Sequence, residues 1–175
     1  MKQLFIIATI FGIFLSGCNQ DEASVQEIQP ETYTVQSVQA LEQRLVQLNE
    51  KLSADYLQMK QIYGYAFSNT TALDANNLKS LNVQAVSATA LKPVKEHYCS
   101  LMNGYFTELY RLGHFNLTLV ETIKLNNAPT KGLATHFVNT ASFYQFVMEE
   151  HSTYKQAQQL MGFGCNLRAA LSPIS

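Results

Sequence analysis

Charged residues are scarce in this 175-residue chain: Asp, Glu, Lys and Arg make up 14% of it, and the formal net charge is −1. Nucleic-acid-binding proteins normally carry an excess of Lys and Arg, because these side chains neutralise phosphates. The balance here therefore excludes nucleic acid as an expected partner. Tryptophan is absent too, but nine tyrosines and ten phenylalanines supply aromatic side chains for a core.

Motifs of the common enzyme and cofactor classes are also missing. The chain contains no G-x-S-x-G, phosphate-binding loop, dinucleotide-binding glycine pattern, H-E-x-x-H or C-x-x-C-H. We therefore expect no enzymatic activity, no metal and no cofactor. A cell-wall hydrolase is a weaker hypothesis, because it needs convergent carboxylates or a His–acid pair. Its candidates are Glu96, His97, Glu149, Glu150 and His151, which the favoured interpretation places on solvated helix faces.

The longest uncharged apolar run, Leu4–Leu15, is also short. A membrane-spanning helix needs about 20 residues, whereas the apolar region of a signal peptide has about 7–15. Lys2 precedes the run, and its last residue, Leu15, is followed by Ser16, Gly17 and Cys18. This order of basic, apolar and small residues predicts a signal peptide rather than a spanning helix.

Leu15-Ser16-Gly17-Cys18 resembles the lipobox of bacterial lipoprotein precursors at all four positions. The resemblance implies cleavage between Gly17 and Cys18, a diacylglycerol on the Cys18 thiol and usually a further acyl chain on the new amine. Two or more acyl chains anchor a protein stably. Asn19 is not the Asp that commonly retains Gram-negative lipoproteins in the inner membrane. The resemblance thus implies an outer-membrane anchor facing the periplasm, or a plasma-membrane anchor in a Gram-positive cell.

This interpretation divides the chain into a removed signal peptide (residues 1–17), a lipidated flexible tether (18–34) and a helical domain (35–175). Residues 19–34 are polar and acidic, and they lack apolar periodicity, which is typical of a disordered spacer. Two alternatives remain open. Cys18 can instead be buried or disulfide-bonded after ordinary cleavage, and residues around Val25 and Ile28 can form an ordered edge.

The periodicity of the remaining chain predicts an all-α bundle of four to five helices, with a long first and a long last helix. Apolar residues recur at helical spacing over 35–67, weakly over 76–91, from Pro93 to about residue 123 with an interruption at Gly113, and over 130–161. In the last helix the stripe predicts that Phe137 and Tyr144 are in the core. Phe143 and Phe146 point elsewhere, so the alternative that one of them is exposed stays open, but a core position is the favoured interpretation for this aromatic cluster.

With Cys18 assigned to the lipid, Cys99 and Cys165 remain. An exported protein is in a compartment that permits disulfides. We therefore expect a Cys99–Cys165 bond, and the alternative is two free buried thiols.

The leading functional hypothesis is a non-enzymatic, membrane-anchored module that binds another protein, of the secretion or assembly accessory type or the toxin-immunity type. The anchor, the spacer and the missing catalytic motifs favour it. The alternative is a small-ligand carrier or sensor with a pocket inside the bundle. Its expected lining is Met59, Tyr63, Tyr105 and Tyr144.

Overall fold

The computed structural model describes residues 29–125, 128–129 and 131–172. Within these ranges the chain is mostly helical and contains no strand, apart from an isolated antiparallel bridge between Phe67 and Val86. The prediction of an all-α fold is confirmed. The signal peptide, Cys18, Val25 and Ile28 lie outside the described residues.

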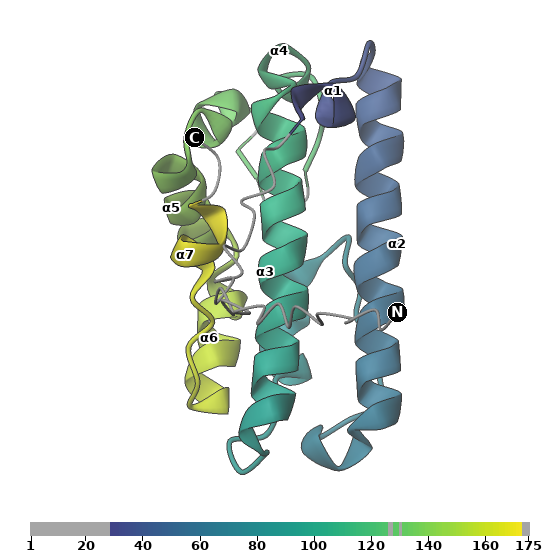
Figure 1. Cartoon of the computed structure of the whole chain (residues 1–175), viewed down its shortest axis with the longest axis vertical. Helices are drawn as coiled ribbons and strands as arrows, with labels where there is room; N and C mark the ends of the chain where they lie inside the picture. The colour runs from purple at the N-terminus through teal and green to yellow at the C-terminus, as the bar shows by residue number, and fades with distance from the viewer. Residues whose placement is uncertain (1–28, 126–127, 130, 173–175) are drawn as a thin grey trace, which may run out of the picture.

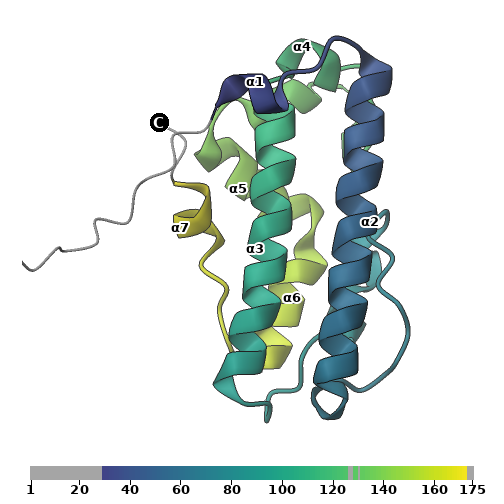
Figure 2. The ribbon, with the colours of Figure 1, turned by 45° about the vertical axis from the view of Figure 1, so that its right-hand side comes forward.

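Two long helices, α2 (Val38–Ile62) and α3 (Lys92–His114), form the centre of the fold. They run side by side in opposite directions, as Figures 1 and 2 show. The Ser37 hydroxyl caps α2 by accepting a hydrogen bond from the Ala40 amide, and α3 begins with a proline in its first turn. Both helices therefore begin where local chemistry favours a start.

The apolar stripe predicted for the first helix is largely buried. Leu41, Leu52, Tyr56 and Met59 are at most 3% exposed. Burying such side chains contributes roughly 1.5–3 kcal/mol each for the aliphatic members, before the entropy of folding is counted. The stripe thus joins α2 to the rest of the core.

Gly113 does not interrupt α3, which continues through it to His114. A Cβ atom added at Gly113 would lie 2.0 Å from Cδ1 of Phe137. Phe137 belongs to the 3-10 helix η3 (Leu133–Phe137), and it is 1% exposed. Gly113 therefore allows close packing of a later segment on α3, a role that sequence periodicity does not reveal.

The C-terminal region differs from the single helix expected over 130–161. After η3, the chain forms α5 (Thr140–Glu150), α6 (Ser152–Met161) and the short α7 (Leu167–Leu171). The Asn139 side chain caps α5 by accepting from the Ser142 amide, so a new helix starts there. His151, at φ −106° and ψ 46°, separates α5 from α6.

These breaks change which aromatic side chains are buried. Phe143 and Phe146 are 0% and 1% exposed, whereas Tyr144 is half-buried with its ring under the guanidinium of Arg168 at 4.6 Å. The favoured interpretation, a core position, is confirmed for Phe143 and Phe146, and the alternative that one of them is exposed is wrong. Both rings are buried because the apolar register from Leu133 and Phe137 does not continue past the break at Asn139.

The segment between α2 and α3 is irregular rather than the helix expected over 76–91. It contains two 3-10 helices, η1 (Gly64–Ala66) and η2 (Leu78–Gln84). The Lys60 ammonium, buried at the end of α2, donates to the carbonyl oxygens of Asn69 (3.2 Å) and Thr71 (2.8 Å) and to the side-chain oxygens of Asn69 (3.0 Å) and Gln84. Lys60 therefore fastens this segment to α2.

The domain begins before Val35, because the end of the expected tether is structured. Residues Pro30–Tyr33 form one helical turn, α1, and Tyr33 is buried. Its hydroxyl donates to the Glu108 carboxylate at 3.0 Å, and the same carboxylate pairs with Arg111 at 2.6 Å. The boundary predicted at residue 34 is therefore corrected to about Pro30, since Tyr33 has a buried site on α3.

A buried asparagine strengthens this attachment. The Asn116 amide nitrogen donates to the carbonyl oxygens of Tyr33 (3.0 Å) and Leu112 (2.8 Å), and its side-chain oxygen accepts from the Val35 amide at 2.9 Å. Asn116 precedes the short helix α4 (Leu117–Val120) at the same end of the bundle as α1, as Figure 1 shows. Among the described helices, none combines the length and the apolar character needed to cross a bilayer.

The structure brings Cys99 and Cys165 together, with their sulfur atoms 1.94 Å apart and their Cα atoms 4.9 Å apart, as in a disulfide. The bond joins the first half of α3 to the segment between α6 and α7. Closing a loop of this length contributes about 4 kcal/mol in the chain-entropy model, as an upper figure.

Candidate functional site

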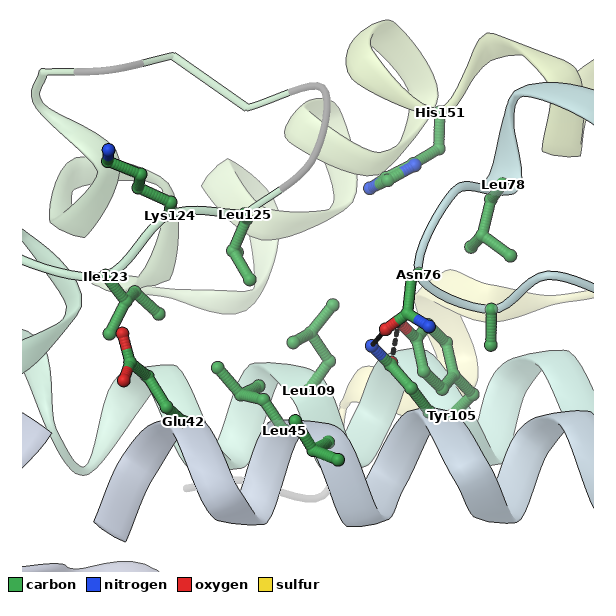
Figure 3. Close-up of a pocket in the computed structure, with 13 residues that line it drawn as sticks. Glu42, Leu45, Asn76, Leu78, Tyr105, Leu109, Ile123, Lys124, Leu125 and His151 are labelled. Atoms are coloured by element: carbon green, nitrogen blue, oxygen red, sulfur yellow. Dashed lines mark hydrogen bonds between the residues drawn. The ribbon is translucent and has the colours of Figure 1, made fainter. Parts of the chain in front are cut away.

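A pocket of about 340 Å³ opens between α2 and α3 (Figure 3). The turn at 75–78, the segment at 123–125 and the α5–α6 junction complete its wall. Its lining consists of Glu42, Leu45, Val46, Asn49, Ala75, Asn76, Leu78, Tyr105, Leu109, Ile123, Lys124, Leu125 and His151.

The two long helices supply the lining at regular helical spacing. On α2, Glu42, Leu45, Val46 and Asn49 follow one another at intervals of three, one and three residues and so share one face. Across the pocket, Tyr105 and Leu109 lie one turn apart on α3. The pocket therefore has a fixed frame of two packed helices.

A chain of three polar side chains crosses one end of the pocket. The Tyr105 hydroxyl donates to Oδ1 of Asn49 at 2.9 Å, and Nδ2 of Asn49 donates to Oδ1 of Asn76 at 2.9 Å. Figure 3 shows both bonds. Burial raises the pKa of Tyr105, so its hydroxyl keeps its proton at neutral pH. These three hydrogen-bonded side chains are thus polar but uncharged.

His151 supplies the most unusual group of the pocket. Its imidazole points into the pocket in Figure 3, and its ring centroid lies 5.8 Å from those of Phe106 and Phe146. Its Nδ1 atom is out of contact with solvent and has no hydrogen-bond partner. Burial lowers the pKa of His151 from 6.5 to about 4, because the charged form is desolvated. The ring is therefore neutral at physiological pH.

The charged members of the lining, Glu42 and Lys124, are both exposed. They have opposite signs, and Figure 3 places them together at one side of the pocket. The other lining side chains are neutral, so the pocket has an apolar wall, neutral polar groups and a balanced pair of charges.

The residues proposed for acid–base chemistry do not form one site. Glu96 is exposed and pairs with Lys92 at 3.4 Å. Glu149 and Glu150 are exposed at the end of α5, where Glu149 accepts from the Gln145 amide at 2.8 Å. Neither lines the pocket that His151 enters. The polar face that the sequence predicts for the two glutamates agrees with their exposure, but it does not describe His151.

His97 lies elsewhere on α3, with its ring edge-on to Tyr63 at 5.8 Å. Of the four side chains expected to line a pocket, Tyr105 alone does so here, while Met59 is fully buried and Tyr63 and Tyr144 lie outside this lining. The sequence names His151 only as a candidate for acid–base chemistry. Its entry into this pocket is not predicted, because it depends on the break between α5 and α6, where no glycine or proline indicates a helix end.

In the described ranges, no group of three or more His, Cys, Asp or Glu side chains is placed to hold a metal ion. No family model matches this chain, and no curated protein or solved structure matches it significantly. The functional argument therefore depends on the residues and their geometry.

Proposed function

We propose that this chain is the precursor of a lipid-anchored bacterial envelope lipoprotein whose helical domain binds another protein. The lipobox-like residues Leu15–Cys18 support the anchor. The Cys99–Cys165 contact supports a compartment outside the cytoplasm, because disulfides persist there. Within the domain, α2 and α3 with the C-terminal helices act as one bundle that carries the binding surface.

The observation that carries the binding proposal is a group of exposed apolar side chains far from the chain's entry into the domain. Ile62, Tyr65 and Leu91 are 55%, 70% and 66% exposed. They belong to the end of α2, to η1 and to the residue that precedes α3, segments that Figures 1 and 2 place together at the lower end of the bundle. Tyrosine is enriched in protein interfaces, and large apolar side chains gathered on an exposed surface are typical of interaction sites.

The geometry suits presentation of this lower end to a partner. The chain enters at the opposite end, where Tyr33 is attached to α3. A helix with the 25 residues of α2 is about 37 Å long at 1.5 Å per residue. A domain tethered at its upper end would thus hold Ile62, Tyr65 and Leu91 well away from lipid headgroups.

Site-specific photo-crosslinking in the host envelope tests the binding surface. A photoreactive residue in place of Tyr65 is expected to give a defined adduct with one envelope protein. The matched control is the same residue in place of Val138, which is also exposed but lies between η3 and α5. Equal adducts at both positions, or none at Tyr65, would contradict the proposed surface.

Mass spectrometry of the mature N-terminus tests the anchor. The expected species begins at Cys18 and carries acyl chains, and Cys18→Ala is expected to remain uncleaved and unlipidated. Cleavage at another bond, or acylation of the Cys18→Ala protein, would refute the lipoprotein assignment.

The pocket beside His151 favours a second candidate function, the binding of a small ligand. Native mass spectrometry of the protein isolated from its host envelope is the direct measurement. A bound mass that is lost in Val46→Trp would support it, because Val46 is exposed and lines the pocket. Apo protein alone, across growth conditions, would count against it.

A further inference from the structure

The pocket favours an uncharged occupant, because its interior polar groups are themselves uncharged. Tyr105, Asn49 and Asn76 satisfy one another through hydrogen bonds, and none carries a formal charge. Glu42 and Lys124 are exposed and oppose each other in sign. A carboxylate or an ammonium placed against the apolar wall would lose hydration without a buried counter-charge, which is costly.

The geometry around His151 also fixes the hydrogen bond that it can offer. A protonated, doubly donating imidazole would require an acceptor at Nδ1, but Nδ1 is buried without a partner. A proton on Nδ1 would be equally unpaired, whereas an unpaired lone pair costs less. The proton therefore resides on Nε2, and the ring is a neutral donor toward the pocket (Figure 3).

The apolar wall sets the remaining character of the occupant. Seven aliphatic side chains line the pocket: Leu45, Val46, Ala75, Leu78, Leu109, Ile123 and Leu125. The volume of about 340 Å³ is at the lower end of the roughly 300–1,000 Å³ range for ligand pockets. A pocket of this size suits a small molecule rather than a lipid with long chains.

We infer that the pocket binds a small uncharged molecule, whose aromatic or aliphatic part contacts the aliphatic lining side chains and whose hydroxyl or carbonyl oxygen accepts a hydrogen bond from Nε2 of His151. This inference rests on the second candidate function, small-ligand binding. It adds the chemical class of the ligand and the atom that recognises its polar end.

Three probes of nearly equal shape and different charge test the inference: 3-phenylpropan-1-ol, 3-phenylpropanoate and 3-phenylpropylamine. Each is titrated at pH 7 into the complete mature chain with Cys18→Ser, which needs no detergent. Binding is followed by the nitrogen and carbon-bound proton signals of the His151 imidazole. The alcohol is expected to shift these signals saturably, and the acid and the amine to bind at least about tenfold more weakly.

Two tryptophan variants on α2 locate the binding. Val46→Trp, which fills the pocket from an exposed position, is expected to weaken alcohol binding at least tenfold. Leu57→Trp is the control, since Leu57 is exposed on the same helix but does not line the pocket. It is expected to bind the alcohol like the parent chain.

Three results would overturn the inference: no saturable shift with the alcohol, equal or tighter binding of a charged probe, or undiminished binding by Val46→Trp. A failure of this kind is distinguishable from failure of the second candidate function. If native mass spectrometry still finds a ligand that Val46→Trp loses, the site stands and only its assigned chemical class is wrong.

Discussion

Acidification is expected to destabilise the domain through His151. Its pKa is about 4 in the folded protein against 6.5 for an unburied histidine. Between these values the unfolded chain binds a proton that the folded chain excludes, so stability rises with pH. The depressed pKa therefore favours the unfolded state as pH falls from about 6.5 toward 4. From the two pKa values, the linkage relation gives a fall in the free energy of unfolding of about 2 kcal/mol between pH 7 and pH 5, and of about 3 kcal/mol between pH 7 and pH 4.

Urea unfolding at pH 7 and pH 5 measures this loss, and His151→Gln provides the matched control. The variant has no imidazole to protonate, so its stability is expected to fall about 2 kcal/mol less between the two pH values than that of the parent. Its stability at pH 7 is irrelevant to the comparison, since only the change with pH is compared. The nearest ring neighbours of His151 are Phe106 and Phe146, and neither titrates.

Two results would refute this reasoning. One is an identical pH dependence in the parent and His151→Gln. The other is a His151 titration midpoint near 6.5 in the folded protein, followed by NMR, because it would mean that the imidazole is hydrated.

Three further predictions concern stability, each measured by urea unfolding. Gly113→Ala is expected to lower the free energy of unfolding by about 1–3 kcal/mol, because the added methyl group overpacks the contact with Phe137. Gly104→Ala has open space around its Cβ position and is expected to raise the free energy of unfolding by up to about 1 kcal/mol through helix propensity. A change of the same sign in both variants would contradict the packing argument. Lys60→Met is expected to lower the free energy of unfolding by about 2–3 kcal/mol, because it leaves the buried side-chain oxygen of Gln84 and part-buried oxygens of Asn69 and Thr71 without their donor. An unchanged midpoint would exclude that role. Reduction of Cys99–Cys165 is expected to lower stability by up to about 4 kcal/mol, and insensitivity to dithiothreitol would indicate free thiols.

Sequence periodicity predicts the two central helices well, because their buried stripes are long and continuous. The stripe over 35–67 corresponds to α2, and the start near Pro93 corresponds to α3. A local signal also predicts the end of α6, because Gly162, which follows its last residue, adopts a left-handed φ of 62°. In these elements local preference and tertiary burial agree.

The remaining elements could not be predicted because tertiary contacts decide them. Over 76–91 the chain forms the short 3-10 helix η2 instead of the expected helix, and Gln84 of η2 accepts a hydrogen bond from the buried Lys60 ammonium. Asn139 is a recognisable N-cap residue, but the apolar spacing of the sequence continues across it and predicts one uninterrupted helix. The sequence singles out His151 only beside Glu149 and Glu150, and no local signal predicts the helix break that directs its ring into the pocket.

The Cys99–Cys165 bond closes part of the chain into a covalent loop and leaves the rest outside it. The closed loop contains most of α3, α4, η3, α5 and α6, whereas α2 and the segment fastened by Lys60 lie outside it. Opening of α2 is therefore not limited by the covalent loop, while opening of the C-terminal helices is. We expect the amide protons of α2 to exchange with solvent before those of α5 and α6, so that the half of the domain that follows the proposed tether is also the first to open.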